Sequence, residues 1–340
     1  MAVTSQQIAD MAGVSRGTVD RVLNGRPGVS EANRVRVQAI ADKLGYVPNR
    51  AGKALSTAKK PVQIGLVLSC VDNPFYDEVI RGIEACRNDY PEYNIEYRYR
   101  RLKGYSPLEQ ADALEKLSDC NVVLITPVNE QMVVDKVNTL TARGIPVITL
   151  NSDLEHSDRL LHVGCDYLAS GRTAGGLAGL LANGRGRVGI VTGSLRMLGH
   201  RQRVDGFRAV MREEYPAMEE AWLLETNDDD RRAYEMLLRQ MERDGDVSAL
   251  YFGVGGIPDG VRAVVEADAS GRLPVIVACD DIPQTREYIH RGVIEATVCQ
   301  EPYWQGHEAV RQALEYWITG KKPEPDIIHT KNEIKIRHNL

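Results

Sequence analysis

The chain has 340 residues, of which 43% are hydrophobic, and a formal net charge of −5. This length suffices for a small module and a two-lobed body with a buried core. No apolar run approaches the roughly 20 residues that span a bilayer, and the start of the chain lacks the apolar stretch of a secretory signal, so we expect a soluble, cytoplasmic protein.

The net charge averages two segments of opposite sign. Residues 1–60 contain ten Lys/Arg and four Asp/Glu, a net charge of +6, so the other 280 residues carry −11. A basic head on an acidic body indicates that the head alone meets a polyanion such as DNA. On charge alone, a solvated basic surface is an equal alternative, and the sequence of the head decides between the two.

The head has the pattern of a helix-turn-helix motif. Thr4 and Gln7 have the spacing of a capping box that begins a first helix, and Gly13 provides the chain reversal after it. Ser15 caps a second short helix over residues 15–24. The apolar positions expected to face inward are Ile8, Ala9, Ala12, Val19, Val22 and Leu23. A tight turn of this kind leaves the start of the second helix free to enter a major groove.

The outer face of the second helix is polar and carries Arg16, Gly17, Asp20 and Arg21. Arginine is well suited to recognising guanine in the major groove. A third helix, which begins after Ser30, closes the small core. Its inward stripe consists of Val37, Ile40, Ala41 and Leu44. The head therefore predicts sequence-specific DNA binding.

A family resemblance runs through about the first 58 residues. The head resembles the DNA-binding domain of the lactose-repressor (LacI/GalR) family in IADMAGVSRGTVDRVLNG (8–25) and VSEANRVRVQAIADKLGYVPNRAGKAL (29–55). In that family the second helix reads operator bases. The resemblance therefore implies DNA contacts at Arg16, Gly17, Thr18, Arg21 and Asn24. Of these, Thr18 and Asn24 are expected to contact the DNA backbone. Asp20 stands where the family usually has serine, which predicts an operator unlike the familiar ones.

The next segment, YVPNRAGKALST (46–57), is similar to the hinge helix of the same family. There the resemblance makes Leu55 the leucine that paired hinge helices insert into the minor groove. Asn49 is expected to cap the segment, and Arg50 and Lys53 to meet phosphates. Gly52 costs about 1 kcal/mol relative to alanine in so short a helix, so we expect disorder without DNA. A plain flexible linker is the alternative.

From Val62 onward, short β-rich runs alternate with amphipathic stretches, which is typical of parallel sheets covered by helices. A first block of predicted strands covers residues 62–69, 94–100, 121–128 and 145–152, and a second block covers 186–193, 222–226, 249–255, 274–280 and 294–300. Two such sheets form two lobes with a cleft between them. Ligands of open α/β sheets bind beyond the carboxyl ends of strands, so the residues that follow the strands should line the cleft.

Those residues are polar or aromatic and suit a carbohydrate. They are Asp72-Asn73-Pro74-Phe75-Tyr76, Asn151-Ser152-Asp153, Asp280-Asp281 and Gln300. Carboxylates and amides pair with vicinal hydroxyls, and aromatic rings lie against the apolar face of a sugar. Each residue alone has a structural alternative, because an aspartate after a strand is more often a helix cap and a lone phenylalanine is more often core.

The body, over residues 62 to 335, resembles the periplasmic sugar-binding fold of this repressor family and of ribose-binding protein. The similarity is strongest at NPFYDEVIRGIE, GIPVITLNSD, GCDYLASGRTAG, HRQRVDGF and GVIEATVCQEP. By position it implies effector contacts at Asn73, Phe75, Tyr76, Asn151, Ser152, Asp153, Arg201, Asp229, Asp280 and Gln300. Ribose is disfavoured, because Asn151-Ser152 replaces an Asp-Arg pair and Gly255 replaces an asparagine. Gly255 predicts room for a larger ligand.

The prediction is an all-α helix-turn-helix head (1–47), a hinge helix and linker (48–60), and an α/β two-lobed periplasmic-binding-protein-like (type I) body (61–340) for effector binding and dimerisation. The expected partners are a pseudo-palindromic operator, a monosaccharide or polyol effector, and a second copy of the chain. A periplasmic receptor is disfavoured by the basic head. A regulator controlled by a protein corepressor stays open.

No cofactor, metal or catalytic residue is predicted. Neither a Walker motif nor a GxGxxG fingerprint occurs, and Asp280-Asp281 has no histidine or nucleophile beside it in sequence. The six cysteines are scattered, without a CxxC pair, and are expected to be core residues. Gly171, Gly175 and Gly179 recur every fourth residue, which predicts close helix packing.

Overall fold

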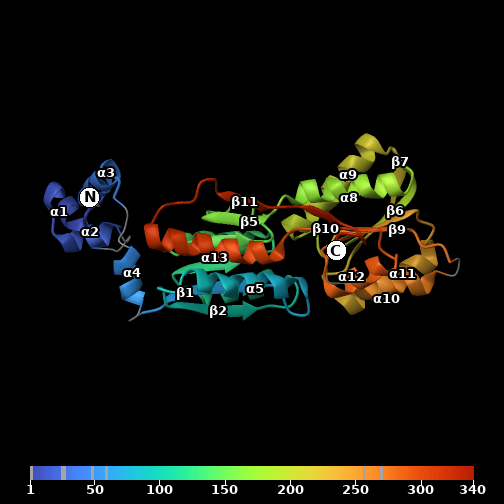
Figure 1. Cartoon of the computed structure of the whole chain (residues 1–340), viewed down its shortest axis with the longest axis horizontal. Coiled ribbons are helices and arrows are strands. Elements are labelled where there is room, and N and C mark those ends of the chain that lie inside the picture. The colour runs from blue at the N-terminus through green and yellow to red at the C-terminus, as the bar shows by residue number, and fades with distance from the viewer. Residues whose placement is uncertain (1–2, 24–27, 47–49, 58–59, 256–257, 269–270) are drawn as a thin grey trace.

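The computed structural model describes residues 3–23, 28–46, 50–57, 60–255, 258–268 and 271–340. Figure 1 shows a helical head at one end, a short helix beside it, and two α/β lobes in succession. Residues 62–165 and 302–330 build the lobe nearer the head, here the N-lobe, and residues 167–299 and 333–340 build the other, the C-lobe.

Three helices build the head: α1 (Ser5–Ala12), α2 (Arg16–Leu23) and α3 (Glu31–Lys43). The capping box of α1 is present, since Thr4 Oγ1 accepts from the Gln7 amide and the Thr4 amide donates to Gln7 Oε1. Gly13 ends α1 at a φ of +64°, a conformation that glycine adopts without a steric penalty. The buried residues are Ile8, Ala9, Ala12, Val19, Val22, Val37 and Ala41. The predicted helix-turn-helix architecture is confirmed.

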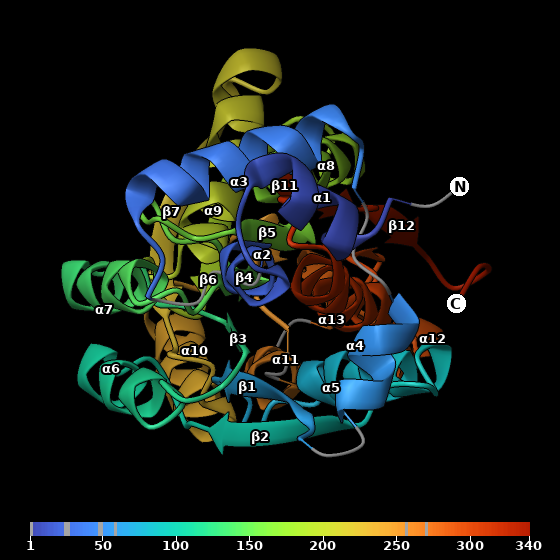
Figure 2. The ribbon, with the colours of Figure 1, turned by 90° about the vertical axis from the view of Figure 1, so that its left-hand side faces the viewer.

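The short helix α4 (Arg50–Thr57) joins the head to the body. The sequence predicted disorder here, whereas the structure holds a helix because the body supports it. The Lys53 ammonium donates to the Trp317 carbonyl of α13 (Pro302–Thr319) and lies 4.9 Å from the centre of the Trp317 ring. Thr57 is buried, and its Oγ1 accepts from the Asn94 amide at 3.1 Å. Tertiary contacts of this kind outweigh the low intrinsic stability of a helix with two turns. Figure 2, which looks onto the head, shows α4 beside α13.

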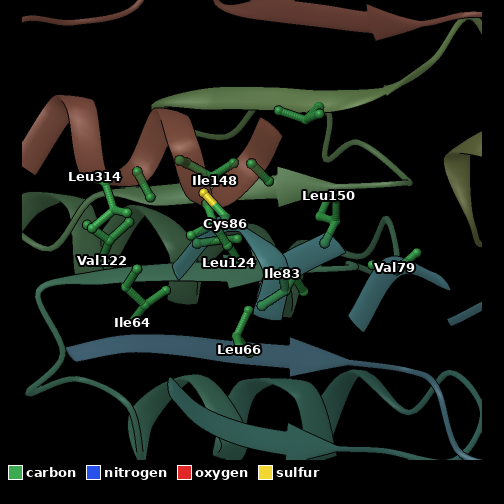
Figure 3. Close-up of a cluster of buried hydrophobic side chains, with 14 of the residues drawn as sticks. Ile64, Leu66, Val79, Ile83, Cys86, Val122, Leu124, Ile148, Leu150 and Leu314 are labelled. Atoms are coloured by element: carbon green, nitrogen blue, oxygen red, sulfur yellow. The ribbon is translucent and has the colours of Figure 1, made fainter. Parts of the chain in front are cut away.

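The N-lobe is a parallel six-stranded sheet of order β11-β5-β4-β3-β1-β2. Its strands are β1 (Val62–Leu68), β2 (Ile95–Arg101), β3 (Val122–Ile125), β4 (Val147–Leu150), β5 (Leu161–Cys165) and β11 (Ile327–Thr330). Helices α5 (Phe75–Cys86) and α13 cover one face, and α6 (Pro107–Glu115) and α7 (Gln131–Ala142) cover the other. Figure 3 shows alternate side chains of β1, Ile64 and Leu66, directed into the first of these cores.

The C-lobe repeats this plan with the order β12-β10-β9-β8-β6-β7, in which only the edge strand β12 is antiparallel. Its strands are β6 (Arg185–Thr192), β7 (Ala217–Glu225), β8 (Ala249–Phe252), β9 (Val275–Cys279), β10 (Ala296–Cys299) and β12 (Glu333–Lys335). One face carries α8 (Tyr167–Leu181) and α9 (Leu198–Glu214), and the other carries α10 (Asp230–Asp244), α11 (Pro258–Ala267) and α12 (Pro283–His290).

Three connections link the lobes in the described part of the chain: β5 to α8, β10 to α13, and β11 to β12. Sequence patterning missed β5, β11 and β12. The strands β11 and β12 are short and partly exposed at sheet edges, so neither carries a clear apolar pattern. Because these connections run directly between the two sheets, the carboxyl ends of both sheets' strands border the space between the lobes.

The predicted close packing of the glycine-rich helix is confirmed. A Cβ added at Gly171 would lie 2.0 Å from the Arg203 carbonyl of α9, and one at Gly179 would lie 2.2 Å from the Tyr215 ring. All six cysteines are buried and free, as expected of core residues. Among the helices of the described residues, none has both the length and the apolar character that a membrane span requires.

Candidate functional site

The outer face of α2 is accessible along its length. Arg16, Gly17 and Arg21 are exposed, and Thr18 is half-buried. The Arg16 Nε donates to Ser5 Oγ of α1 at 3.3 Å, so α1 helps to orient this guanidinium. The Thr18 amide donates to Ser15 Oγ, which also shares a hydrogen bond with the Thr18 hydroxyl, so Thr18 helps to cap α2. The outer face of α2 therefore presents two exposed guanidinium groups, those of Arg16 and Arg21.

The remaining predicted DNA contacts fall at the end of the head and on α4. Asn24, Asn49 and the side chain of Arg50 lie outside the described residues. Lys53 is directed toward α13, so a phosphate contact would require it to leave Trp317. Leu55 is 76% exposed, whereas Lys53 and Thr57 of the same helix contact the body.

A cavity lies between the lobes, and side chains nearly close it in this structure, leaving about 20 Å³ of accessible space. Seven residues expected to contact an effector line it: Asn73, Phe75, Tyr76, Asn151, Ser152, Asp280 and Gln300. Gly255, which the resemblance placed at a contact position, also lines it. The sequence did not indicate the other lining residues, which are Tyr105, Tyr167, Met197, Gly199, His200, Arg203, Asp228 and Val254. The two groups come from both lobes.

Backbone geometry at the strand ends directs polar side chains into this cavity. Asn151 after β4 and Asp280 after β9 both have φ values of +64°. Left-handed backbone is tolerated by asparagine and aspartate better than by most side chains. A turn of this kind immediately after a strand sends the side chain away from the sheet and toward the other lobe.

Gln300 is the centre of the cavity's hydrogen-bond network. Its Nε2 donates to both carboxylate oxygens of Asp280, at 3.0 and 3.1 Å. Its Oε1 accepts from the Tyr167 hydroxyl at 2.9 Å and from Asn151 Nδ2 at 3.3 Å. Gln305 of α13 donates to the Gln300 carbonyl at 2.9 Å. Burial raises the pKa of Asp280 to about 6, because the charged form is desolvated inside this network.

Arg203 is the buried cation of the cavity and is only 2% exposed. Its Nη1 donates to the Gly253 carbonyl at 3.3 Å, and its guanidinium lies 4.7 Å from the centre of the Tyr167 ring. Among the described residues, its Nε and Nη2 have no hydrogen-bond partner. A buried guanidinium with two unused donors is suited to an oxygen-rich ligand.

The resemblance had assigned this role to Arg201, which the structure contradicts. The Arg201 side chain is 40% exposed and pairs with Glu155 at 2.6 Å, outside the cavity. Residues two apart on a helix point in nearly opposite directions. Arg203 shares its helix face with Gly199 and Phe207, four residues away on each side, and both of those are buried. The apolar period of the HRQRVDGF segment could therefore have indicated that Arg203, and not Arg201, faces inward.

Two predicted aspartates also lie outside this cavity. Asp153 forms a double hydrogen bond with Arg159, at 2.6 and 2.8 Å, and accepts from the Thr149 hydroxyl at 2.7 Å. Asp229 caps α10, where its Oδ1 accepts from the Arg232 amide at 2.8 Å. The helix-cap alternative therefore describes Asp229, whereas Asp153 is held in an ion pair with Arg159. Asp228, the neighbour of Asp229, lines the cavity instead.

Gly255 does not provide the extra room that its missing side chain suggested. A Cβ at this position would lie 2.8 Å from Asp280 Oδ2, so the carboxylate of Asp280 already fills that space. The glycine therefore permits the position of Asp280 rather than enlarging the cavity.

One side-chain group of the described residues has donors close enough to hold a metal ion: Cys86, Asp89 and His307, within 4.8 Å of one another. His307 Nε2 already bonds Asp89 Oδ2 at 2.7 Å. The three residues lie on α5, the following 3₁₀ turn and α13, so their proximity could not be read from sequence spacing.

The head and the cavity together define a class of protein: a DNA-binding regulator whose body has the fold of small-molecule receptors. Residues 4–49 match the model for bacterial regulatory proteins of the lacI family, and residues 64–322 match that for the periplasmic binding protein domain. The chain belongs to the lacI family of bacterial regulatory proteins. It is a DNA-binding transcriptional regulator, and its relatives are named as regulators rather than enzymes.

The chain is 28% identical to catabolite control protein A of Priestia megaterium, covering 77% of this chain and 76% of that protein. It is 26% identical to the ribose operon repressor of Haemophilus influenzae, covering 92% and 91%. Among solved structures, the glucose-galactose binding protein GanP of Geobacillus stearothermophilus has a TM-score of 0.75 and 25% identity, covering 83% of this chain and 99% of that one. A Bacillus halodurans solute binding protein with bound myo-inositol, at 20% identity, shares the fold with a TM-score of 0.72, covering 82% and 95%.

Proposed function

We propose that the protein is a homodimeric, cytoplasmic repressor that binds a pseudo-palindromic operator and releases it when a monosaccharide or polyol fills the interlobe cavity. The observation that carries this proposal is the cavity itself, which gathers buried polar groups from the strand ends of both lobes. A ligand that contacts both lobes favours the arrangement in which they are close, and a population shift of this kind can be transmitted to DNA.

The chemistry of the cavity suits a carbohydrate. Phe75 and Tyr76 both line the cavity and stand edge to face, with their ring centres 5.3 Å apart, so either ring can lie against the apolar face of a sugar. Arg203 offers unused donors, and Asp280 offers acceptors beside Gln300. Stacking combined with paired donors and acceptors is how a site binds a ring that carries hydroxyls. The names of the ribose operon repressor and of the sugar-bound neighbours agree with this class of effector.

We further propose that DNA is read by Arg16 and Arg21 of α2, with Gly17 allowing close approach and Thr18 near the backbone. Two copies are needed because an operator half-site accommodates one head. The exposed Leu55 is assigned to the centre of the operator, where paired α4 helices insert an apolar wedge and kink the duplex. In this scheme the lobes supply the effector site and hold the dimer together.

The first test is a thermal-shift screen of the full chain against pentoses, hexoses and inositols. A ligand at a hundred times its dissociation constant stabilises the protein by about 2.7 kcal/mol, which raises the melting temperature measurably. The ligand should then weaken binding to an operator selected from random DNA. Arg203→Gln should abolish both effects, whereas Arg208→Gln, on the same helix but paired with Glu220 on the surface, should preserve them. A screen in which no sugar or polyol binds would refute the proposed effector class.

A further inference from the structure

Asp228 lies in a loop whose backbone conformation and glycine neighbour leave space for its side chain. The residue follows β7, and both Asn227 and Asp228 adopt left-handed backbone, with φ values of +57° and +53°. A Cβ on Gly193, at the end of the neighbouring strand β6, would lie 2.0 Å from Asp228 Oδ1. Only glycine at 193 therefore leaves room for this carboxylate, which packs against it, and Asp228 lines the cavity.

The two oxygens of Asp228 have different surroundings. Its Oδ2 accepts a hydrogen bond from the hydroxyl of Tyr105, which belongs to the N-lobe, so the contact bridges the lobes. Within the described residues, Oδ1 is buried and has no partner. A buried carboxylate oxygen without a donor is costly, which indicates that a ligand supplies the donor.

The charges of the cavity restrict what that ligand is. Two carboxyl groups, Asp228 and Asp280, face a single cation, Arg203. Burial raises the pKa of Asp228 to about 7 and that of Asp280 to about 6, so both carry their full negative charge only above pH 7. His200 adds no positive charge, because its Nδ1 accepts from the Ser194 amide and burial lowers its pKa to about 3. Tyr105 is also neutral, since burial raises the pKa of its hydroxyl. An anionic ligand would meet more negative than positive charge. An ammonium group only donates, so it cannot supply the acceptor that the unused Nε and Nη2 of Arg203 require.

We propose that Asp228 is a specificity-determining residue that accepts a hydrogen bond from a hydroxyl of an uncharged, unphosphorylated polyol, while Arg203 donates to an oxygen of the same molecule. This inference rests on the proposed function of the cavity as the effector site. A hydroxyl group supplies the donor that Asp228 lacks, and a neighbouring hydroxyl supplies the acceptor that Arg203 lacks. The phosphate group of an ester offers mainly acceptors and places its negative charge against two acids.

The experiment is calorimetric titration of the full chain with matched pairs: glucose and glucose 6-phosphate, ribose and ribose 5-phosphate, and myo-inositol and its monophosphate, together with glucosamine. The neutral member of at least one pair should bind, with its phosphate ester about 100-fold weaker or worse, because like charges placed together in a buried site are strongly unfavourable. Asp228→Ala should weaken the neutral ligand by about 10- to 100-fold, since a buried hydrogen bond is lost.

Asp228→Asn removes the charge at nearly constant shape, so it should narrow the preference for the neutral ligand over its ester by at least about tenfold. Glu235→Gln, which removes an exposed carboxylate from α10 of the same lobe, is the matched control and should change neither affinity. Melting curves of each variant check that it folds.

The outcomes separate the two proposals. Equal binding of an ester and its neutral parent, tighter binding of glucosamine, or unchanged affinity in both Asp228 variants would overturn the role of Asp228 and leave the effector site standing. Failure of every compound to bind the unmodified chain would overturn the proposed function, and this inference with it.

Discussion

Gln305 and Trp317 lie twelve residues apart on α13, and each contacts a different part of the regulator. Gln305 donates to the carbonyl of Gln300 at the cavity, whereas Trp317 holds Lys53 of α4. At 1.5 Å per residue the two positions are separated by about 18 Å of continuous helix. Figure 1 shows α13 running from the region of α4 to the boundary between the lobes. Helix α13 is therefore a rigid connection between the effector cavity and the hinge helix α4.

Trp317→Leu should reduce the response to effector without preventing effector binding. The substitution removes the ring beneath the Lys53 ammonium, a contact of about 0.5–2 kcal/mol. We expect the ratio of operator affinities without and with effector to fall by about 3- to 10-fold, while the effector dissociation constant changes less than about twofold. Fluorescence anisotropy with labelled operator measures the ratio. Trp304→Leu, at the cavity end of the same helix but 53% exposed, is the control and should leave the ratio unchanged.

Arg21→Ala should weaken operator binding by about 10- to 100-fold, the usual cost of losing one arginine–guanine contact. Binding to random DNA should fall much less, because the salt-dependent phosphate contacts remain. Competition titrations at fixed salt distinguish the two. Arg231→Ala removes an exposed arginine of the C-lobe helix α10 and should affect neither. An equal loss of affinity for operator and for random DNA would indicate that Arg21 contacts the DNA backbone and not a base.

Leu55→Ser should reduce DNA bending without destabilising the protein. Leu55 is exposed, so its replacement costs little in the folded state, but a serine cannot act as an apolar wedge between base steps. The end-to-end FRET of a doubly labelled operator measures the bend. Leu108→Ser on α6, also exposed at 68%, serves as the control. A bend of the same size in both variants would show that Leu55 does not act as a wedge at the operator.

Gly171→Ala should destabilise the protein by about 1–3 kcal/mol, because the added Cβ would lie 2.0 Å from the Arg203 carbonyl and force α8 away from α9. Gly176→Ala, on the same helix but with open space around its Cβ, should instead stabilise it by up to about 1 kcal/mol. Urea denaturation of the two variants tests the opposite signs. Displacement of Arg203 should also make Gly171→Ala bind effector more weakly.

Asp228→Asn should stabilise the ligand-free protein at pH 8 and have less effect at pH 5. Burial raises the pKa of Asp228 to about 7, above its ordinary value of 3.8, so the folded protein binds this proton more tightly than the unfolded chain. The penalty for the buried charge is therefore present above pH 7 and is relieved as the pH falls below 7 and Asp228 becomes protonated. Thermal melts across this range should show the two proteins converging at low pH. A constant difference would contradict the raised pKa.

The sequence predicted the order of most elements because their apolar patterns are strong, as in the continuous apolar run of β3 and the inward stripe of α1. It failed where the period was weak or the choice lay between neighbours. Asp228 and Asp229 both follow a strand, and only the left-handed turn at 227–228 decides which enters the cavity. Arg201 and Arg203 differ by half a turn of one helix. Tyr105 contributes through a loop that no sequence pattern places near β7.

The threading of the chain between the lobes bears on how this protein is synthesised. The N-lobe core includes Leu314 and Ile318 of α13, so it stays incomplete until α13 has left the ribosome. The head is synthesised first, whereas the Trp317 contact that holds α4 forms only after α13 has been synthesised. Nascent chains therefore carry a head that no effector can yet control. Mutations that slow the docking of α13 would lengthen that period and should appear as leaky regulation rather than as loss of protein.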